Sequence, residues 1–260
     1  MSIRNSASFY RHLLQHPEVR KAFYHFTSLT GLCQYERLFE YVETIPNKEL
    51  RILDWGCGNG WFSYYLWHRG FTNVVSYGYG WDAIDPGRKY LPGLQYVNGE
   101  EAQVNNPSDI PFPDESFDLI FSVGVLEHVH ETGGDQLHSM REINRILRPG
   151  GRFFCYHLPN QYTWIEFIKG LVVSGKGKHY LHTKKFTSRD ISNLAAESGF
   201  EVSTMRRYNV LPYNIHRNAS YDNRLLASVY TGLDNLMLKT PLSHLSQCYL
   251  FESVKNGNAQ

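Results

Sequence analysis

The chain has few cysteines and no long apolar segment. Four cysteines occur among its 260 residues, namely Cys33, Cys57, Cys155 and Cys248, and none forms a Cys-x-x-Cys pair or a His-Cys spacing. Closely spaced thiols would indicate a zinc site or a disulfide framework. The pattern therefore favours reduced thiols, and we expect no metal site. No uninterrupted run of about eighteen apolar residues is present either, which argues against a transmembrane helix.

The sequence also lacks a strong net charge and an export signal. Its 26 basic and 25 acidic residues give a formal net charge of +1, so no overall field draws the molecule to nucleic acid or to a membrane. The first thirty residues carry arginine and histidine throughout and lack the apolar core of a secretory signal. We therefore expect a cytoplasmic protein.

The two halves of the chain nevertheless differ in charge. Residues before Gly151 include 13 basic and 18 acidic side chains, whereas the rest includes 13 basic and 7 acidic ones. The positive excess is densest in KGKHYLHTKKFTSR, at residues 176–189. Two interpretations are open: a solvated loop and helix end, or a surface that receives a phosphate or carboxylate of a substrate.

The composition and the hydrophobic pattern predict one large α/β domain. At 42% hydrophobic and 15% aromatic, 260 residues suffice for a substantial core. Apolar runs typical of strands alternate with helical patterns, which predicts a parallel sheet with helices on both faces. We expect helices at 8–27, 30–44, 61–69, 133–146, 188–199 and 223–238, and strands at 50–53, 74 onward, 95–97, 117–122, 152–156, 200–207 and 247–254.

A glycine-rich turn follows the first predicted strand. It reads Asp54-Trp55-Gly56-Cys57-Gly58-Asn59-Gly60, and ligands of open α/β sheets bind beyond the carboxyl ends of the strands. Glycines allow a tight turn and let a ligand lie against the backbone. A dinucleotide site expects G-x-G-x-x-G open to a pyrophosphate. The observed G-x-G-x-G with a preceding carboxylate disfavours a dehydrogenase.

Five motifs in order resemble those of the class I S-adenosylmethionine-dependent methyltransferases, particularly the small-molecule group called type 11. They are ILDWGCGNG at 52–60, GWDAIDPGRKYL at 80–91, IPFPDESFDLIFSVGVLEHV at 110–129, REINRILRPGGRFF at 141–154 and FTSRDISNLAAESGFEV at 186–202. The resemblance implies a Rossmann-like, seven-stranded, mostly parallel sheet with an antiparallel last strand and helices on both faces. It implies a single methyltransferase domain over 1–260, divided into an N-terminal helical cover (1–46), a cofactor-binding half (47–158), a substrate-side flap (159–187) and the C-terminal half of the sheet (188–255).

The resemblance implies S-adenosylmethionine as cofactor, with S-adenosylhomocysteine as its product. In the family, the glycine turn packs under the methionine part, and the positive sulfonium suits a nearby carboxylate. The ribose would bind an acid after the second strand, for which Asp82 and Asp85 are equal candidates because that strand is expected to end near Gly78. The implied cofactor-binding residues are Asp54, Gly56, Cys57, Gly58, Asn59, Gly60, either Asp82 or Asp85, Glu100 and Glu101 near the adenine, and Ser122 and Val123 beside the cofactor.

Methyl transfer requires a nucleophile in line with the departing sulfur, with its proton removed when it is a hydroxyl. Histidine suits such a base because its unperturbed pKa of about 6.5 lies near working pH. His128 and His157, at the predicted carboxyl ends of two strands, are the catalytic candidates, followed by His130. The Leu-Glu-His-Val pattern around His128 recurs in the family whatever the substrate, so a structural or cofactor-side role is the alternative for that residue.

Aromatic and basic residues outside the cofactor half are candidates for binding the substrate. They are Tyr24, Tyr162, Trp164, Lys176 and Lys178, although aromatics at helical spacing are more typical of a core than of a binding surface. The apolar run 165–173 leads into the basic segment. This pattern suggests a flap that receives an anionic or lipid-linked acceptor, or that touches a membrane surface.

The expected activity is methyl transfer from S-adenosylmethionine to an oxygen of a small metabolite, sugar or lipid-linked precursor, with nitrogen and carbon as weaker alternatives. A methyltransferase-like fold that binds cofactor or a partner protein without catalysis is the second hypothesis. We expect no nucleic-acid substrate. Ser122-Val123-Gly124-Val125 stands where nucleic-acid enzymes carry an Asn/Asp-Pro-Pro-aromatic tetrapeptide, and no strongly basic domain is present.

Overall fold

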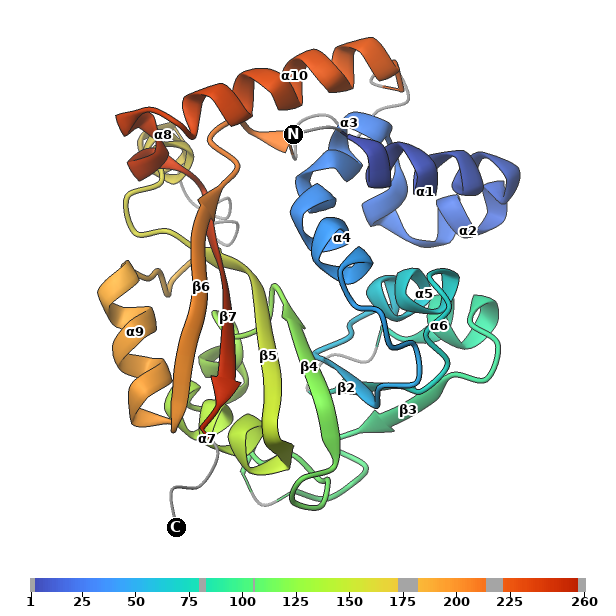
Figure 1. Cartoon of the computed structure of the whole chain (residues 1–260), viewed down its shortest axis with the longest axis vertical. Coiled ribbons are helices and arrows are strands. Elements are labelled where there is room, and N and C mark those ends of the chain that lie inside the picture. The colour runs from blue at the N-terminus through green and yellow to red at the C-terminus, as the bar shows by residue number, and fades with distance from the viewer. Residues whose placement is uncertain (1–2, 80–82, 105, 173–181, 214–221, 257–260) are drawn as a thin grey trace. The chain divides into compact units, whose positions relative to one another are not determined.

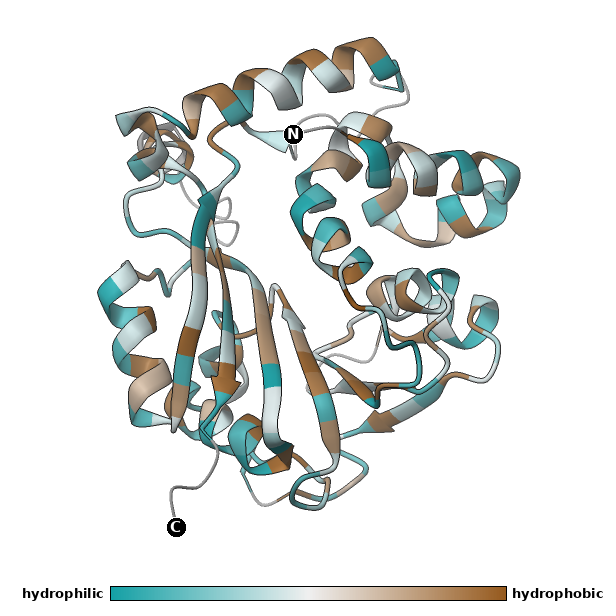
Figure 2. Ribbon diagram, in the orientation of Figure 1, coloured by the Kyte–Doolittle hydropathy of each residue, from teal (hydrophilic) through white to brown (hydrophobic). Residues whose placement is uncertain are grey.

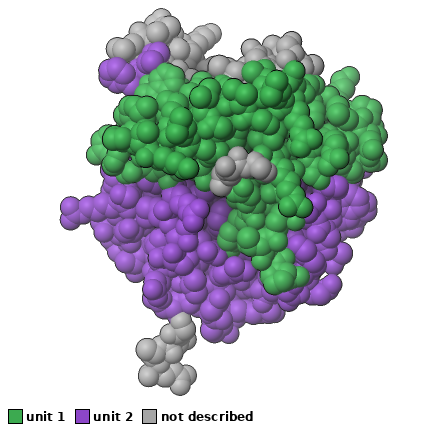
Figure 3. Space-filling view, turned by 45° about the horizontal axis from the view of Figure 1, so that its top comes forward, with its two compact units in different colours: residues 1–46, 162–165, 207–247 green, residues 47–161, 166–206, 248–260 purple. Residues whose placement is uncertain are grey.

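A computed structural model describes residues 3–79, 83–104, 106–172, 182–213 and 222–256. The chain forms two compact units, coloured separately in Figure 3. Unit 1 comprises Met1–Pro46, Tyr162–Ile165 and Arg207–Gln247, and unit 2 comprises Asn47–Gln161, Glu166–Arg206 and Cys248–Gln260. Except for the last two residues of its edge strand β6, the whole sheet belongs to unit 2.

The sheet of unit 2 has seven strands in the order β3-β2-β1-β4-β5-β7-β6 (Figure 1). The pairs β3–β2, β2–β1, β1–β4 and β4–β5 are parallel, whereas β7 runs antiparallel to β5. The predicted Rossmann-like sheet with an antiparallel last strand is therefore confirmed. The strands are β1 (Ile52–Trp55), β2 (Val74–Gly78), β3 (Gln95–Asn98), β4 (Phe117–Val123), β5 (Leu147–Pro159), β6 (Phe200–Tyr208) and β7 (Cys248–Lys255).

Alternation along the strands sends successive side chains to opposite faces of the sheet. On one face, Ile120 and Phe153 join a buried core that includes residues of α7 (Gln136–Ile146) and α9 (Ser188–Glu197). On the other face, Phe121 packs edge-on against Phe62 of α5 (Trp61–His68), with ring centroids 4.9 Å apart. In Figure 2, hydrophobic positions (brown) occur along β4 and β5.

Helix ends in unit 2 follow the capping signals of the sequence. The side chain of Thr187 accepts from the amide of Asp190, and the Asp190 carboxylate accepts from the amide of Thr187, which makes a reciprocal capping box at the start of α9. Asp135 caps α7 by accepting from the His138 amide at 2.8 Å. One further helix, α6 (Asp85–Tyr90), was not expected from the sequence.

Unit 1 is helical, and there the expected helix at 8–27 is wrong. The chain forms α1 (Arg4–Gln15) and α2 (Pro17–Ala22) instead, because Pro17 disfavours the helical conformation at His16 and cannot donate a backbone hydrogen bond. The segment expected as one helix at 30–44 forms α3 (Leu29–Leu32), a 3₁₀ turn and α4 (Glu36–Glu43). The remaining elements are α8 (Trp164–Val172), which spans the boundary of the two units, and α10 (Arg224–Met237). Within the described ranges, none of these helices has both the length and the apolar character needed to cross a bilayer.

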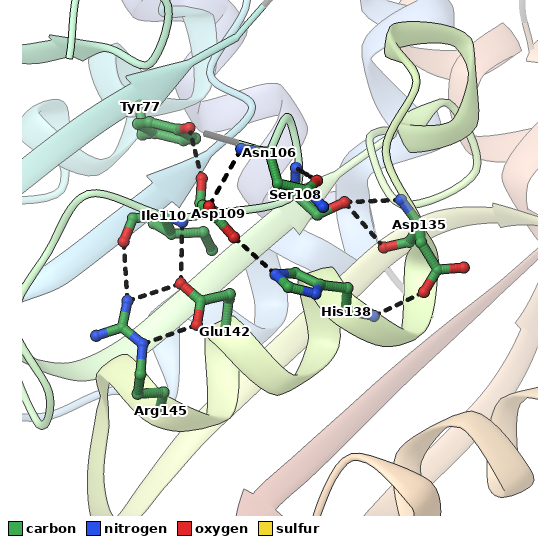
Figure 4. A network of polar contacts seen from close by, with 9 residues as sticks. All are labelled: Tyr77, Asn106, Ser108, Asp109, Ile110, Asp135, His138, Glu142 and Arg145. Atoms are coloured by element: carbon green, nitrogen blue, oxygen red, sulfur yellow. Dashed lines mark hydrogen bonds and ion pairs between the residues drawn. The ribbon is translucent and has the colours of Figure 1, made fainter. Parts of the chain in front are cut away.

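A polar network holds the segment that leads into β4 (Figure 4). The Arg145 guanidinium of α7 donates to both carboxylate oxygens of Glu142, to the Ile110 carbonyl at 2.9 Å and to the Phe112 carbonyl at 2.8 Å. The His138 ring lies 2.7 Å from an Asp109 carboxylate oxygen, and the Tyr77 hydroxyl donates to the Asp109 carbonyl. These bonds fasten a segment with no strand or helix of its own.

Replacing Arg145 by methionine is expected to lower the free energy of unfolding by about 2 kcal/mol. The variant keeps the aliphatic stem but removes the Arg145 donor of the Phe112 carbonyl and one of two donors of the Ile110 carbonyl, which still accepts from the Phe112 amide. Bonds to charged groups contribute about 1.5–3 kcal/mol each before solvent screening of a part-exposed group. Urea denaturation measures the change. Arg141→Met, at an exposed position of the same helix, is the control. A loss no larger than that of the control would contradict the assigned role.

Candidate functional site

The turn after β1 adopts a backbone that favours glycine. Gly56, Gly58 and Gly60 have φ angles of 73°, 52° and 82°, in the left-handed region that residues with a Cβ rarely occupy. The amides of Gly56 and Cys57 both donate to the Tyr77 carbonyl of β2, at 2.8 and 2.9 Å. The turn is therefore fixed against the sheet at the carboxyl ends of β1 and β2.

The start of α6 and the loop after β4 lie so close to this turn that they leave no room for a Cβ on Gly60 or Gly56. A Cβ on Gly60 would lie 3.1 Å from the Ile84 side chain and 3.2 Å from the Gly87 backbone at the start of α6. A Cβ on Gly56 would lie 2.4 and 2.5 Å from the two methyl carbons of Val125, in the loop after β4. The glycine turn and the loop after β4 are thus in direct contact.

Asp54 lies buried directly before the turn. Its side chain is 1% exposed, and Oδ2 accepts from the Ser63 hydroxyl at 2.6 Å, which in turn lies 2.7 Å from the Ser76 hydroxyl. Burial raises the pKa of Asp54 to about 6, against the lowering effect of the Ser63 hydrogen bonds. A carboxylate held this way is suited to a cationic ligand, whose charge would offset the cost of burial.

The other residues expected at the cofactor lie around the same edge. Asn59 is buried and accepts from the Trp61 amide, Ser122 pairs in register with Trp55, and Val123 is the last residue of β4. Glu100 and Glu101 are exposed after β3. Asp85 begins α6 with a side chain that is 92% exposed and 3.3 Å from Arg88, whereas Asp82 lies outside the described residues.

The loop after β4 places a carboxylate and an imidazole side by side. Glu127 is 3% exposed, and its burial raises its pKa to about 7, against the effect of the neighbouring His128. The half-exposed His128 has Nδ1 at 2.9 Å from the Glu131 carboxylate and Nε2 at 3.9 Å from Glu127 Oε1. Gly124, with φ 74°, turns the chain into this loop and donates to the Tyr156 carbonyl.

His157 has an unusual backbone for a histidine. Its φ is 71°, and the pairing of β5 with β7 shifts register between Cys155 and Leu158, which marks a bulge. Burial and, to a smaller extent, the charge of His182 lower the pKa of His157 to about 3. Left-handed backbone at a non-glycine residue costs about 1–3 kcal/mol and is enriched at functional sites, and bulges re-aim side chains there.

Three further residues, Glu166, His182 and Lys185, lie at this edge, and the sequence did not indicate the contacts that they make. Glu166 of α8 accepts from His182 Nδ1 and pairs with Lys185 Nζ at 2.9 Å. Although burial works in the other direction, these bonds hold the pKa of Glu166 down to about 2. The His182 ring lies 5.6 Å from the His128 ring. In the sequence, His182 and Lys185 are only parts of the basic segment 176–189, and no local pattern indicates their partners.

The expected substrate residues are not gathered in one place by the described structure. Tyr24 and Tyr162 are exposed, and Trp164 donates through Nε1 to the Val210 carbonyl at 2.7 Å, all within unit 1. Lys176 and Lys178 lie outside the described residues. His130 bonds to the Thr183 hydroxyl at 2.7 Å in unit 2.

Comparison with known proteins finds similarity to methyltransferases. Residues 53–155 match the family model Methyltransf_11, described as a methyltransferase domain. A "Probable S-adenosylmethionine-dependent methyltransferase" of Mycolicibacterium smegmatis is 30% identical over 136 residues, 48% of this chain and 49% of that protein. A "tRNA U34 carboxymethyltransferase" of Saccharophagus degradans is 32% identical over 114 residues, 41% of this chain and 32% of that protein.

The alignments thus span half or less of the length of these curated relatives. The fold likeness extends further. The solved structure of a "SAM dependent methyltransferase from Archaeoglobus fulgidus" superposes with a TM-score of 0.55 at 16% identity, and covers 87% of this chain and 94% of that one.

Proposed function

The chain contains a class I S-adenosylmethionine-dependent methyltransferase domain of the type 11 family, and from this premise we propose that it methylates a hydroxyl oxygen of a small molecule. The observation that carries the proposal is the left-handed glycine turn beyond β1, with buried Asp54 before it and the Glu127–His128 loop packed against it. The first part suits the methyl donor and the second suits the acceptor.

For the methyl donor, this chain provides a glycine turn that fits the methionine part and a carboxylate that suits the positive charge. The glycine turn offers backbone without side chains to the methionine part, and Asp54 offers a negative charge close to a cationic ligand. When bound, S-adenosylmethionine supplies an electrophilic methyl group on a positively charged sulfur. A pyrophosphate would instead meet the buried carboxylate of Asp54, which is why a dinucleotide fits this turn poorly.

On the acceptor side, we assign the handling of the hydroxyl proton to His128 and His157, at the ends of β4 and β5. His157 is neutral near pH 7, since its pKa is lowered to about 3, so it accepts a hydrogen bond without carrying charge of its own. The Glu131 carboxylate orients the ring of His128. The acceptor oxygen then needs only to be aligned with the methyl carbon.

An anionic part of the acceptor would be received by the basic segment 176–189. Lys185 in that segment already pairs with Glu166, so this role falls to its neighbours, among them Lys176 and Lys178. Contact with a membrane surface would use the same segment.

Isothermal titration followed by a methyl-transfer screen tests the proposal. We expect micromolar binding of S-adenosylmethionine and S-adenosylhomocysteine and none of NAD. With cofactor labelled in its methyl group, a metabolite extract is expected to yield a labelled product of low mass that resists nuclease. Label in nuclease-sensitive material would contradict the small-molecule assignment, which matters because one relative is named for a tRNA.

The variant His157→Asn is expected to lower kcat by about 10-fold or more, because the neutral imidazole accepts a hydrogen bond that aligns the acceptor hydroxyl with the methyl carbon. Asparagine tolerates the left-handed conformation better than most residues, so the bulge is retained. The affinity for S-adenosylhomocysteine, measured by titration, stays unchanged. Unaltered turnover would remove His157 from the reaction.

A further inference from the structure

One group of potential metal ligands stands out among the described residues. Glu127, His128 and His182 each offer one ligand atom, and these atoms all lie within 4.8 Å of one another. Glu127 and His128 come from the loop after β4, whereas His182 lies 54 positions further along the chain. All three belong to unit 2. The spacing of the cysteines indicated no metal site, and this group contains no cysteine.

The outer partners of the two histidines fix which ring nitrogen faces the group. His128 Nδ1 lies 2.9 Å from the Glu131 carboxylate, and His182 Nδ1 is bonded to the Glu166 carboxylate. A carboxylate accepts the proton of Nδ1, which leaves Nε2 with a lone pair. Metal-binding histidines almost always carry such a carboxylate or carbonyl on their second nitrogen.

Glu127 supplies an independent indication of a missing ligand. Its side chain is 3% exposed, and its Oε2 has no hydrogen-bond partner among the described residues, while Oε1 lies 3.9 Å from His128 Nε2. A buried carboxylate oxygen without a donor is costly. The compensating donor is provided neither by the two imidazoles, whose protons point to Glu131 and Glu166, nor by another described side chain.

We propose that Glu127, His128 and His182 bind a divalent first-row transition-metal ion. Two imidazoles and one carboxylate form the donor set of catalytic zinc sites and of non-haem iron sites, both of which keep coordination positions open. Magnesium is disfavoured because it prefers oxygen ligands. Bond lengths of about 2.0–2.2 Å place donor atoms roughly 3.3 Å apart, so binding draws these side chains together by small rotations.

A metal at this position would act on the acceptor, and this consequence rests on the proposed function. Glu127 and His128 share their loop with Val125, which contacts the glycine turn. A cation lowers the pKa of a hydroxyl bound to it. With the metal bound, His128 is a ligand and no longer accepts the hydroxyl proton, since its Nδ1 is held by Glu131. That proton passes to solvent, the oxygen forms a bond to the methyl carbon, and the carbon–sulfur bond breaks with its electron pair left on sulfur.

Titration of the chelator-treated full chain with Co²⁺ alone, followed by visible absorption, tests the site without substrate or cofactor. We expect one equivalent of Co²⁺ to produce d–d bands that one equivalent of Zn²⁺ removes. His182→Gln and Glu127→Gln are expected to weaken Co²⁺ binding at least 100-fold, and Glu166→Gln about 10–100-fold. His138→Gln is the matched control, since that ring also bonds a carboxylate, of Asp109, but lies in no such group.

Binding of S-adenosylhomocysteine by the same variants shows whether each of them is folded. Retained nucleoside binding with lost Co²⁺ binding supports the site. Absence of Co²⁺ binding in the unaltered chain, or undiminished binding in both His182→Gln and Glu127→Gln, overturns it. Co²⁺ binding by a chain that binds no S-adenosylhomocysteine would instead overturn the proposed function and leave the metal site standing.

Discussion

Gly56→Ala is expected to abolish cofactor binding and to lower the free energy of unfolding by about 3 kcal/mol. Two effects add at this position. The left-handed backbone, with φ 73°, costs an alanine about 1–2 kcal/mol. The new Cβ would also lie 2.4 and 2.5 Å from the methyl carbons of Val125, so the loop after β4 must shift, and overpacking of this kind costs about 1–3 kcal/mol.

Gly150→Ala separates the two effects. Gly150 has the same φ of 73°, but a Cβ there would meet no atom within 4 Å. This control therefore reports the backbone strain alone and is expected to leave cofactor affinity unchanged. Denaturant unfolding and titration with S-adenosylhomocysteine measure both quantities.

The double variant Gly56→Ala with Val125→Ala tests the contact itself. Removing the Val125 methyl groups relieves the two closest contacts and leaves the Cβ of residue 125 at 3.0 Å, whereas the backbone strain stays. The two changes are therefore expected to couple by about 1 kcal/mol or more in a double-mutant cycle. Equal losses in Gly56→Ala and Gly150→Ala, with no coupling, would show that the Val125 contact is unimportant.

Asp54→Asn is expected to weaken S-adenosylmethionine binding about 10–100-fold without unfolding the protein. The carboxamide still accepts the hydrogen bond from Ser63, but it no longer offers a negative charge to the cofactor. A charge pair in a low-dielectric site is worth about 1.5–3 kcal/mol when formed. Titration measures the affinity.

The difference in the free energy of unfolding between the unsubstituted protein and Asp54→Asn depends on pH, because the Asp54 carboxyl is buried. The folded-state pKa of Asp54 is about 6 and its ordinary value is 3.8, so the folded chain holds this proton more tightly than the unfolded chain. The unsubstituted protein therefore loses stability relative to Asp54→Asn as pH rises from about 4 to about 6, by at most about 3 kcal/mol, and the difference is constant above that range. Urea unfolding at pH 4, 5, 6 and 8 measures it.

Asp118→Asn is the control for the affinity change. Asp118 lies near the opposite end of β4, where it accepts from the Arg51 amide and pairs with Arg148. This variant is expected to lose stability while cofactor affinity stays the same. A loss of affinity in Asp118→Asn equal to that of Asp54→Asn would mean that the Asp54 effect is not local.

The fold could be predicted because its signals are local. Strand and helix patterns of five to fifteen residues predicted the alternating elements from which the sheet is built. Three glycines in five residues predicted a tight turn, and in the structure all three have positive φ angles. Where a local signal was overlooked, the prediction failed. Helix α1 ends at Gln15, two residues before Pro17, although the apolar pattern continues through this proline.

The residues proposed to bind the cofactor could be selected from the sequence because they are contiguous. Asp54 to Gly60 lie in one turn, so their types and spacing describe the site by themselves. The structure adds the depth at which Asp54 is buried and its bond to Ser63, nine positions away on the next helix.

The residues proposed to act on the acceptor are brought together by contacts between distant segments. His157 acquires its left-handed backbone from a bulge against β7, almost a hundred positions later in the chain, and nothing local to Tyr156-His157 requires it. Likewise, Glu127 and His128 are recognisable as a motif, but His182 and Glu166 are not, because their roles follow from which segments the fold brings to one edge of the sheet.

The amino-acid sequence by itself determined the alternation of strands with helices, the glycine turn and the acid before it, since each depends on the steric and polar preferences of neighbouring residues. Tertiary structure alone decided which histidines meet which carboxylates, because these contacts join segments that are remote in the chain and are set by the packing of whole strands and helices.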